Sequence, residues 1–509
     1  MLQTVYSAGL SGVDGFLVTV ECNCSNRLPK FDVVGLPDAA VREAKERIKA
    51  AVENNGYDFP EAEITVNMAP ADRKKQGSAY DLALYVGVLG GFRLENIGDV
   101  SDCCFIGELS LSGEVRPVQG TLCMCLAARD AGKKHIFVPA GNAAEASVAD
   151  GCCIYGVRNV SELSDHLSGR NRITPVEFDR NLFERDVAGS ILDYSDVKGQ
   201  ANAKRALEIA AAGGHNVLLI GPPGTGKSML AKRLPSIMPP LTFDEAIETT
   251  KLHSVAGILE ENVSLLTSRP FRSPHHTLSP IALAGGGSYP MPGEISLAHN
   301  GVLFLDELPE FSKASTEVLR QPLEDRKVTI TRATGRVTFP CSFMLVAAMN
   351  PCRCGYYGTS RCTCKEKDIR DYLQKISGPM LDRIDIQIEV PAISYDELSE
   401  RKPGESSAQI RERVVRARQL AVDRFSSEKE KIFCNSSMSP SQIRKFCVLD
   451  EKADVVLRKA FDTMGLSARG HDRILRVART IADLDGSENI KANHIAEAIQ
   501  LRSLDRKYW

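Results

Sequence analysis

The chain has 509 residues, of which 43% are hydrophobic and 25% charged, and its net charge at pH 7 is −2. This composition is typical of a folded globular protein and excludes a largely disordered chain or a collagen-like repeat. No apolar run approaches the roughly 18 residues of a membrane span, and the first residues lack a secretory pattern. We therefore expect a cytoplasmic protein without membrane contact.

Basic residues are unevenly distributed along the chain. Residues 401–509 carry 22 Lys and Arg against 15 Asp and Glu, and the rest of the chain is acidic. Such a region permits contact with a polyanion, although a solvated helical surface has the same composition. The fifteen cysteines are an odd number in a long chain, so most are predicted to be small buried side chains rather than disulfides.

The order of elements predicts a multidomain α/β protein with about three domains. Residues 1–167 mix short strands and helices, which indicates an α+β domain, and the polar, irregular residues 168–190 are interpreted as a linker. Residues 191–395 alternate strands with helices, the pattern of a parallel sheet. Residues 396–509 show apolar residues three and four apart, which predicts a C-terminal helical lid.

A phosphate-binding loop is predicted directly after the apolar strand at 216–220. It reads Gly-x-x-x-x-Gly-Lys-Ser and precedes a helical segment, the context that a P-loop requires. Its glycines let backbone amides face a phosphate at a helix N-terminus. Lys227 is expected to reach the β- and γ-phosphates of ATP, and Ser228 to bind Mg²⁺. The loop consists of Gly221, Pro222, Pro223, Gly224, Thr225, Gly226, Lys227 and Ser228.

Two adjacent histidines, His275 and His276, follow the P-loop in the chain. Neighbouring side chains on a strand point apart, and no third ligand is evident nearby. A structural or pore-loop role is therefore favoured over a metal site.

Polar residues end two further predicted strands. The strand at 302–305 ends in Asp306 and Glu307. Asp306 is expected to hold Mg²⁺ through water, and Glu307 to orient and polarise the attacking water. A later strand ends at Asn350, which is expected to sense the γ-phosphate, although a plain turn residue is the alternative. These motifs, followed by a helical region, occur in the order of an AAA+ ATPase.

A β-hairpin is predicted at 327–339, because apolar and polar residues alternate on both sides of Thr334 and Gly335. Arg332 and Arg336 lie near its tip. In a pore they would contact DNA phosphates without sequence preference. On the residues alone, an edge hairpin with solvated arginines is equally well supported.

Two Cys-x-Cys pairs, Cys352 with Cys354 and Cys362 with Cys364, flank a seven-residue loop. Four thiolates across such a loop could close a tetrahedral, structural Zn²⁺ site, and a reducing compartment favours metal over disulfides. Free surface thiols are the alternative, because this spacing is tighter than the usual Cys-x-x-Cys.

Three arginines are candidates for sensing the nucleotide. Arg383 lies on a short turn before a strand and is interpreted as the arginine that a neighbouring subunit donates to the ATP site, with a surface ion pair as the alternative. Arg469, at the start of a lid helix, is expected to reach the γ-phosphate within its own chain. Arg473, one turn further on, is the competing candidate.

Long blocks of this sequence resemble the YifB/ComM family of magnesium-chelatase-like AAA+ proteins. The resemblance covers essentially the whole chain and implies a Lon-protease-like N-terminal domain, an AAA+ module and a helical lid. It also implies an ATP-driven, hexameric DNA helicase that drives branch migration when transforming DNA recombines, and it favours the pore position for the hairpin. The ATPase subunit of a chelatase, remodelling a protein partner, is the alternative. The blocks are GPPGTGKSMLAKRLPSIMPPL, RPFRSPHHTLSPIALAGGGSYPMPGEISLAHNGVLFLDELPEF, LVAAMNPCRCGYYG and SARGHDRILRVARTIADL.

The Lon-like resemblance implies a test for protease activity. Aligned with the Lon segments, the nucleophilic serine position falls on Ala79 and the lysine position on Leu122. A Ser-Lys dyad needs a hydroxyl and an amine to accept its proton, and neither is present. The domain is therefore predicted to be non-proteolytic.

Overall fold

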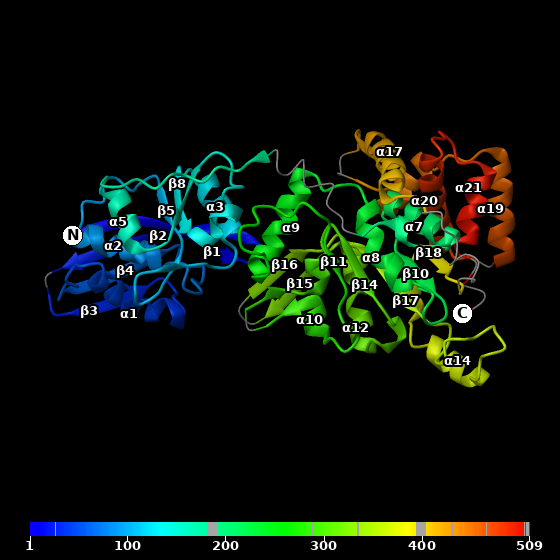
Figure 1. The fold of residues 1–509 in the computed structure, drawn as a ribbon, viewed down its shortest axis with the longest axis horizontal. Coiled ribbons are helices and arrows are strands. Elements are labelled where there is room, and N and C mark those ends of the chain that lie inside the picture. Colours follow the sequence, from blue (N-terminus) through cyan, green and yellow to red (C-terminus); the bar gives the residue numbers. More distant parts are fainter. Residues whose placement is uncertain are drawn as a thin grey trace.

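The computed structural model describes the chain except residues 26, 181–191, 288, 333–334, 393–403, 429–431, 465, 503, 505–507 and 509. Parts of the predicted linker and of the predicted start of the lid lie outside these described residues. Figure 1 shows an N-terminal α+β part, a central module built on a parallel sheet, and a helical C-terminal part, arranged along the long axis. The predicted α/β class is confirmed.

The N-terminal part contains two small sheets. The first has the strand order β1-β2-β4-β3 and the second the parallel order β5-β8-β9, and β6 pairs with β7 as a hairpin. Helix α1 begins at the Asp38 cap, whose side chain accepts from Val41 N. It buries apolar residues three and four apart and leaves most of its charged residues exposed, whereas Arg47 pairs with the buried Asp81 over 2.6 Å. The elements are β1 (Leu2–Ser11), β2 (Asp14–Ser25), β3 (Lys30–Val34), α1 (Ala39–Asn54), β4 (Glu63–Ala69), α2 (Asp81–Phe92), β5 (Cys103–Phe105), β6 (Glu108–Leu109), β7 (Val115–Arg116), α3 (Thr121–Asp130), β8 (His135–Pro139), α4 (Ala143–Ala146), β9 (Cys153–Val157) and α5 (Val160–Leu167).

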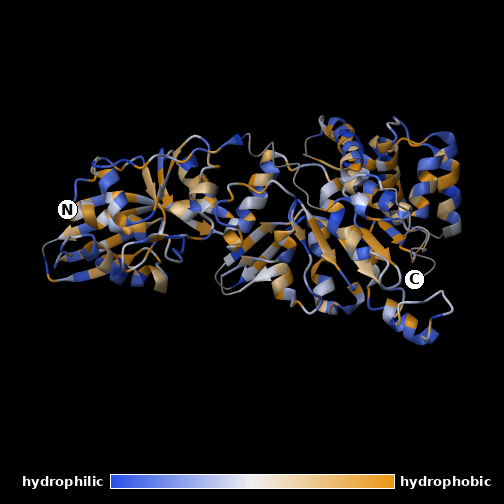
Figure 2. Ribbon diagram, viewed as in Figure 1, coloured by the Kyte–Doolittle hydropathy of each residue, from blue (hydrophilic) through white to orange (hydrophobic). Residues whose placement is uncertain are grey.

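The central module contains a five-stranded parallel sheet with the order β11-β14-β17-β10-β18. Strands β10, β14 and β17 are buried on both faces, as their continuous apolar runs predict (Figure 2). The predicted hairpin is present as β15 paired with β16. The elements are α7 (Ala201–Gly213), β10 (Val217–Ile220), α8 (Lys227–Ile237), α9 (Phe243–Ala256), β11 (Phe271–Arg272), α10 (Pro280–Ala284), β12 (Gly285–Gly286), β13 (Met291–Pro292), α11 (Glu294–Leu297), β14 (Val302–Leu305), α12 (Lys313–Val318), α13 (Arg320–Asp325), β15 (Lys327–Arg332), β16 (Gly335–Pro340), β17 (Met344–Met349), α14 (Glu366–Leu373), α15 (Gly378–Leu381) and β18 (Ile386–Glu389).

The C-terminal helices share a core with one face of this sheet. Alternate strand residues such as Val217 and Leu219 belong to the same apolar cluster as Ile474 and Ile481 of α20. Their neighbours Leu218 and Ile220 face the opposite cluster. The lid is therefore attached by burial of apolar surface. Its helices are α17 (Ser407–Phe425), α18 (Pro440–Phe446), α19 (Glu451–Met464), α20 (Ala468–Leu484) and α21 (Ala492–Gln500).

The N-terminal part docks on helix α9 of the central module. Gly120 N donates to Ser254 O over 3.1 Å, and the Ser254 hydroxyl donates to the Glu145 carboxylate over 2.5 Å. Burial raises the pKa of Glu145. Leu122, the position of the absent lysine, is fully buried in a cluster that includes Leu241 of the central module. At this position, where the Lon-like resemblance implies a lysine, the chain makes an apolar contact between the N-terminal part and the central module.

Within the described residues, no helix combines the length and the hydropathy that crossing a bilayer would demand.

Candidate active site

Three parallel strands bring the predicted nucleotide-binding residues to one edge of the sheet. The P-loop leaves β10, Asp306 follows β14, and Asn350 follows β17. Because β17 pairs in parallel with both β10 and β14, all three carboxyl ends meet at the same edge. This is where open α/β sheets bind ligands.

Side-chain contacts connect these three segments. The Lys227 ammonium donates to Gly221 O over 2.7 Å, to Pro222 O over 2.8 Å, and to Asn350 Oδ1 over 3.2 Å. The Ser228 hydroxyl donates to Asp306 Oδ2 over 2.7 Å. Burial lowers the pKa of Lys227, although Asp306 and Glu307 oppose that shift. A pocket of about 390 Å³ is lined by residues 223–229, Asp306, Glu307, Met349 and Asn350.

The P-loop backbone has the curled form that its glycines predict. Gly224 and Gly226 have φ angles of +79° and +89°, a region that residues with a Cβ seldom adopt. Helix α8 begins directly afterwards at Lys227, so its free amides face the pocket. A triphosphate fits this arrangement because amides, the ammonium and the helix N-terminus all favour negative charge. Ser228 and Asp306 together offer the hard oxygen ligands that Mg²⁺ prefers.

Glu307 is held in an unusual backbone conformation at the mouth of the pocket. Its φ is +52°, and its amide donates to Asp306 Oδ1 over 3.0 Å. The side chain is 56% exposed, and its Oε2 lies 3.5 Å from His276 Nδ1. A positive φ on a residue with a side chain costs energy and is characteristic of functional sites. The contact between His276 and Glu307 was not predicted from the sequence, because nothing in the local pattern indicates that the loop after β11 reaches the end of β14.

Arg383 lies on the opposite edge of the sheet. It precedes β18, which begins level with the start of β10, and Asn216 Nδ2 donates to Arg383 O over 2.9 Å. A four-residue strand spans about 13 Å, so the Arg383 side chain and the P-loop of one chain are on different edges. The guanidinium donates to Glu324 Oε1 over 2.5 Å and to Arg320 O over 3.0 Å.

Arg469 and Arg473 of helix α20 lie near Arg383, beside the edge of the sheet at which the parallel strands begin. Arg473 is 3.6 Å from Asp382 and 3.9 Å from Asp385, and Arg469 is 4.0 Å from Asp382. That Arg469 or Arg473 senses the γ-phosphate of its own chain stays a prediction. The position of both arginines follows from the docking of α20, whose apolar face packs against the core shared with the sheet.

The arginines of the hairpin are free of acidic partners among the described residues. Arg332 and Arg336 are both exposed, and no ion pair to either is formed within the described ranges. Arg332 pairs with Gly335 in the strand register, so both arginines stand next to the tip, whose residues 333–334 lie outside the description.

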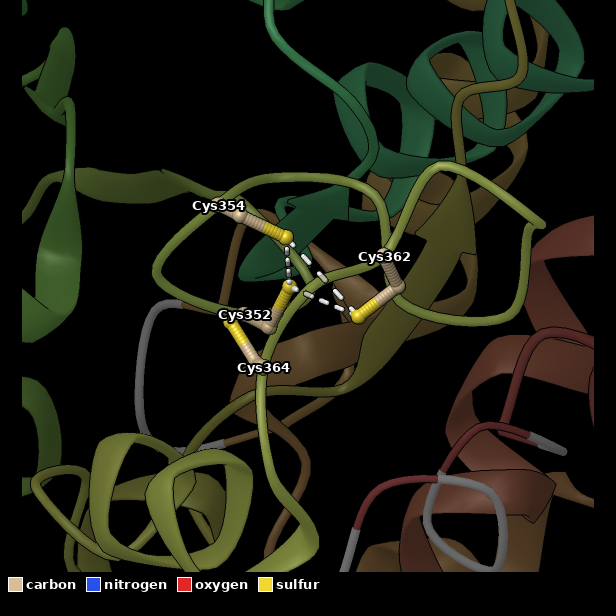
Figure 3. A group of neighbouring side chains, drawn as sticks. All are labelled: Cys352, Cys354, Cys362 and Cys364. Atoms are coloured by element: carbon tan, nitrogen blue, oxygen red, sulfur yellow. Dashed lines mark hydrogen bonds between the residues drawn. The ribbon is translucent and has the colours of Figure 1, made fainter.

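Four cysteine sulfurs from the segment after β17 point toward one another (Figure 3). Cys352 Sγ lies 3.3 Å from Cys354 Sγ and 4.0 Å from Cys362 Sγ, and Cys354 Sγ is 3.8 Å from Cys362 Sγ. With Cys364, all four sulfurs lie within 4.8 Å of one another. Sulfurs at tetrahedral corners about 2.3 Å from a zinc ion are separated by about 3.8 Å, so the cluster has the dimensions of a Zn²⁺ site.

Comparison with known proteins finds magnesium-chelatase family models in three regions of the chain and relatives that match nearly all of it. Residues 193–398 match the family described as "Magnesium chelatase, subunit ChlI", residues 20–142 match "Subunit ChlI of Mg-chelatase", and residues 404–502 match "Magnesium chelatase, subunit ChlI C-terminal". The chain is 41% identical over 507 residues to "Competence protein ComM" of Haemophilus influenzae, covering 99% of this chain and 98% of the relative. It is 40% identical over 511 residues to "Uncharacterized protein YifB" of Escherichia coli, again covering 99% and 98%. A more distant similarity, 22% over 357 residues, links it to "DNA replication licensing factor Mcm6" of Drosophila melanogaster, covering 65% of this chain and 39% of the relative.

Proposed function

Because this chain belongs to the YifB/ComM family of magnesium-chelatase-like AAA+ proteins, we propose that it is an ATP-hydrolysing motor. The observation that carries the proposal is the convergence of Lys227, Ser228, Asp306 and Asn350 at one sheet edge. Their contacts make a site for a triphosphate and its metal ion, with Glu307 at the mouth.

Each residue of the site has a proposed role. Lys227 and the P-loop amides bind the β- and γ-phosphates, and Ser228 and Asp306 hold Mg²⁺, which neutralises phosphate charge when bound. Glu307 accepts a proton from the attacking water, and Asn350 positions that water beside the γ-phosphate.

We place Arg383 at the ATP site of a neighbouring subunit. On its own chain it lies at the edge opposite the P-loop, so only a second copy can bring it to a nucleotide. Arg469 is 69% exposed beside Asp382 on the same edge and would face the same neighbour. A closed ring, which we propose to be a hexamer, gives every P-loop an arginine from the next subunit.

DNA is the proposed substrate of the motor. The support is the pair of exposed arginines next to the hairpin tip, which form no ion pair with any described residue, together with the competence and DNA replication names that two relatives carry. We propose translocation on single-stranded or branched DNA, with branch migration during recombination of transforming DNA as the cellular role. The chelatase names of the matched families favour the second candidate, an ATPase subunit that remodels a protein partner.

The deciding experiment compares ATPase rates without DNA, with single-stranded DNA and with a branched junction, alongside strand displacement. The DNA motor predicts stimulation by DNA and displacement that needs ATP. Basal hydrolysis that no DNA changes would reject the DNA motor and leave the protein-remodelling alternative.

Replacing both Arg332 and Arg336 with Ala should abolish most DNA stimulation and leave basal ATPase activity unchanged. Each lost phosphate contact lowers DNA affinity across all sequences and reduces the salt dependence of binding by about one unit. The charge-matched control is Arg27→Ala with Arg158→Ala, because both are 79% exposed on the N-terminal part. Equal stimulation of the hairpin variant and the control would place the DNA contact elsewhere.

We also propose that the four-cysteine cluster holds a structural Zn²⁺. Four cysteines fill a tetrahedral site and leave no open position for catalysis. The cluster is adjacent to the ATP site, because a Cβ added at Gly355 would lie 2.6 Å from Pro223 Cδ of the P-loop. A zinc ion here would stiffen the segment that follows Asn350 in the chain and packs against the P-loop.

Metal analysis of protein purified under reducing conditions should give about one zinc per chain. Cys352→Ser and Cys364→Ser should each lower the zinc content strongly, since a thiolate is the stronger zinc ligand. Cys153→Ser, an exposed cysteine outside the cluster, is the control and should keep full occupancy. Zinc-free parent protein would reject the site.

A further inference from the structure

An exposed tyrosine, Tyr289, lies close to Lys74 of the N-terminal part, on a loop beside the β15–β16 hairpin of the central module. Tyr289 belongs to the connection between β12 and β13 and is 50% exposed. Gly287, two residues before it, has a φ of +104°, so the loop is shaped by glycine. A large aromatic ring left half in solvent on such a loop is not explained by packing.

Strand β15 of the hairpin lies directly beside this loop. A Cβ added at Gly286 would lie 3.1 Å from Arg332 Nη2, and one added at Gly285 would lie 3.0 Å from Ile330 Cδ1. The short β12–β13 ribbon and the β15–β16 hairpin therefore pack side by side through glycine. Absence of side chains at 285 and 286 lets the guanidinium of Arg332 approach the loop that carries Tyr289.

The N-terminal part reaches Tyr289 with Lys74, whose neighbour in the chain is a second cation, Arg73. Lys74 Nζ lies 5.9 Å from the centre of the Tyr289 ring, and the Arg73 guanidinium covers the Phe16 ring at 4.9 Å. A Cβ added at Gly12, in the turn between β1 and β2, would lie 2.6 Å from Val337 Cγ1 of β16. Figure 1 shows the hairpin on the side of the central module that faces the N-terminal part.

The charges gathered here favour a polyanion. Lys74, Arg73, Arg332 and Arg336 are all exposed, and Asp72 is the acidic member of the N-terminal loop. The Lys74 contact with the ring is near the outer limit for a cation–π interaction and is worth little at an exposed site. Lys74 is therefore a weak partner that leaves the half-exposed Tyr289 ring available to a ligand.

From this arrangement we propose that Tyr289 stacks on a base of single-stranded DNA, while Lys74 and the hairpin arginines bind the flanking phosphates. Aromatic stacking beside a basic track is how proteins grip single strands without reading their sequence. The inference rests on the proposed DNA motor and deepens it, because it assigns the N-terminal part to the DNA path.

The test measures binding of a labelled single-stranded oligothymidylate by fluorescence anisotropy. Tyr289→Ala should weaken binding by about 5- to 100-fold, whereas Tyr289→Phe should bind like the parent, because stacking needs the ring and not the hydroxyl. Lys74→Ala should lower affinity and reduce the salt slope by about one unit. Phe461→Ala, which removes a 40% exposed ring from the lid, is the control and should have no effect.

A second readout uses tryptophan fluorescence. The chain has one natural tryptophan, Trp509, so Tyr289→Trp adds a single reporter, which oligothymidylate should quench on stacking while the parent signal changes little. Tight binding by Tyr289→Ala, or an unquenched reporter in a DNA-bound variant, would overturn the stacking proposal alone. Failure of the parent protein to bind any DNA would instead overturn the proposed function.

Discussion

Replacing Glu307 with Gln leaves a protein that binds ATP but hydrolyses it about 10²- to 10⁴-fold more slowly, the usual contribution of a general base. The amide has nearly the same shape as the carboxylate, so the pocket lined by the P-loop, Asp306 and Asn350 is preserved. It cannot accept a proton from water. Nucleotide affinity from a fluorescent ATP analogue and turnover from phosphate release measure the two effects separately.

A neighbouring glutamate provides the control. Glu310 lies in the same turn after β14 and is 44% exposed, but its carboxylate accepts from Lys375 over 3.2 Å and does not line the pocket. Glu310→Gln should therefore hydrolyse ATP like the parent. Normal turnover by Glu307→Gln, or equal loss in both variants, would remove the proposed role of Glu307.

The ATP pocket could be predicted because each of its parts is local in sequence. A P-loop is recognisable from eight consecutive residues, and Asp306 and Asn350 each follow an apolar strand directly. Parallel strands then bring their carboxyl ends to one edge without further information. The hairpin was predictable for the same reason, since alternation around Gly335 is a short-range signal.

Residues that depend on docking between elements were not predictable. His276 contacts Glu307 only because the loop after β11 lies against the end of β14. The contacts of Arg469 and Arg473 with Asp382 were not predictable either, because helical spacing defines which face of α20 is buried but not where that face docks. The approach of Lys74 to Tyr289 likewise depends on how two domains meet.

Arg383→Ala should reduce turnover by about 10³-fold or more, the range for an arginine that stabilises transition-state charge from a neighbouring subunit. ATP binding should persist, because Arg383 lies on the edge away from the P-loop of its own chain. Arg370→Ala, a 74% exposed arginine on α14, is the matched control and should retain activity. Native mass or light scattering checks that the variant still assembles.

Mixing Arg383→Ala chains with Lys227→Ala chains should recover activity that neither variant has alone. An interface between subunits is complete when it combines the intact P-loop of the first variant with the intact Arg383 of the second. Random assembly of equal amounts makes about one quarter of all interfaces complete. ATPase activity should therefore be absent for either variant alone and greatest when the two are mixed in equal amounts.

Recovery of activity distinguishes an ATP site shared between two subunits from a site formed within one chain. If Arg383 served only the nucleotide of its own chain, every chain in the mixture would carry one defect and no ratio would restore turnover. Its contacts with Glu324 and with Arg320 O would then be purely structural. Glu324→Gln keeps both Lys227 and Arg383, so in a shared site it should hydrolyse ATP without a complementing chain, whereas Arg383→Ala on its own stays inactive.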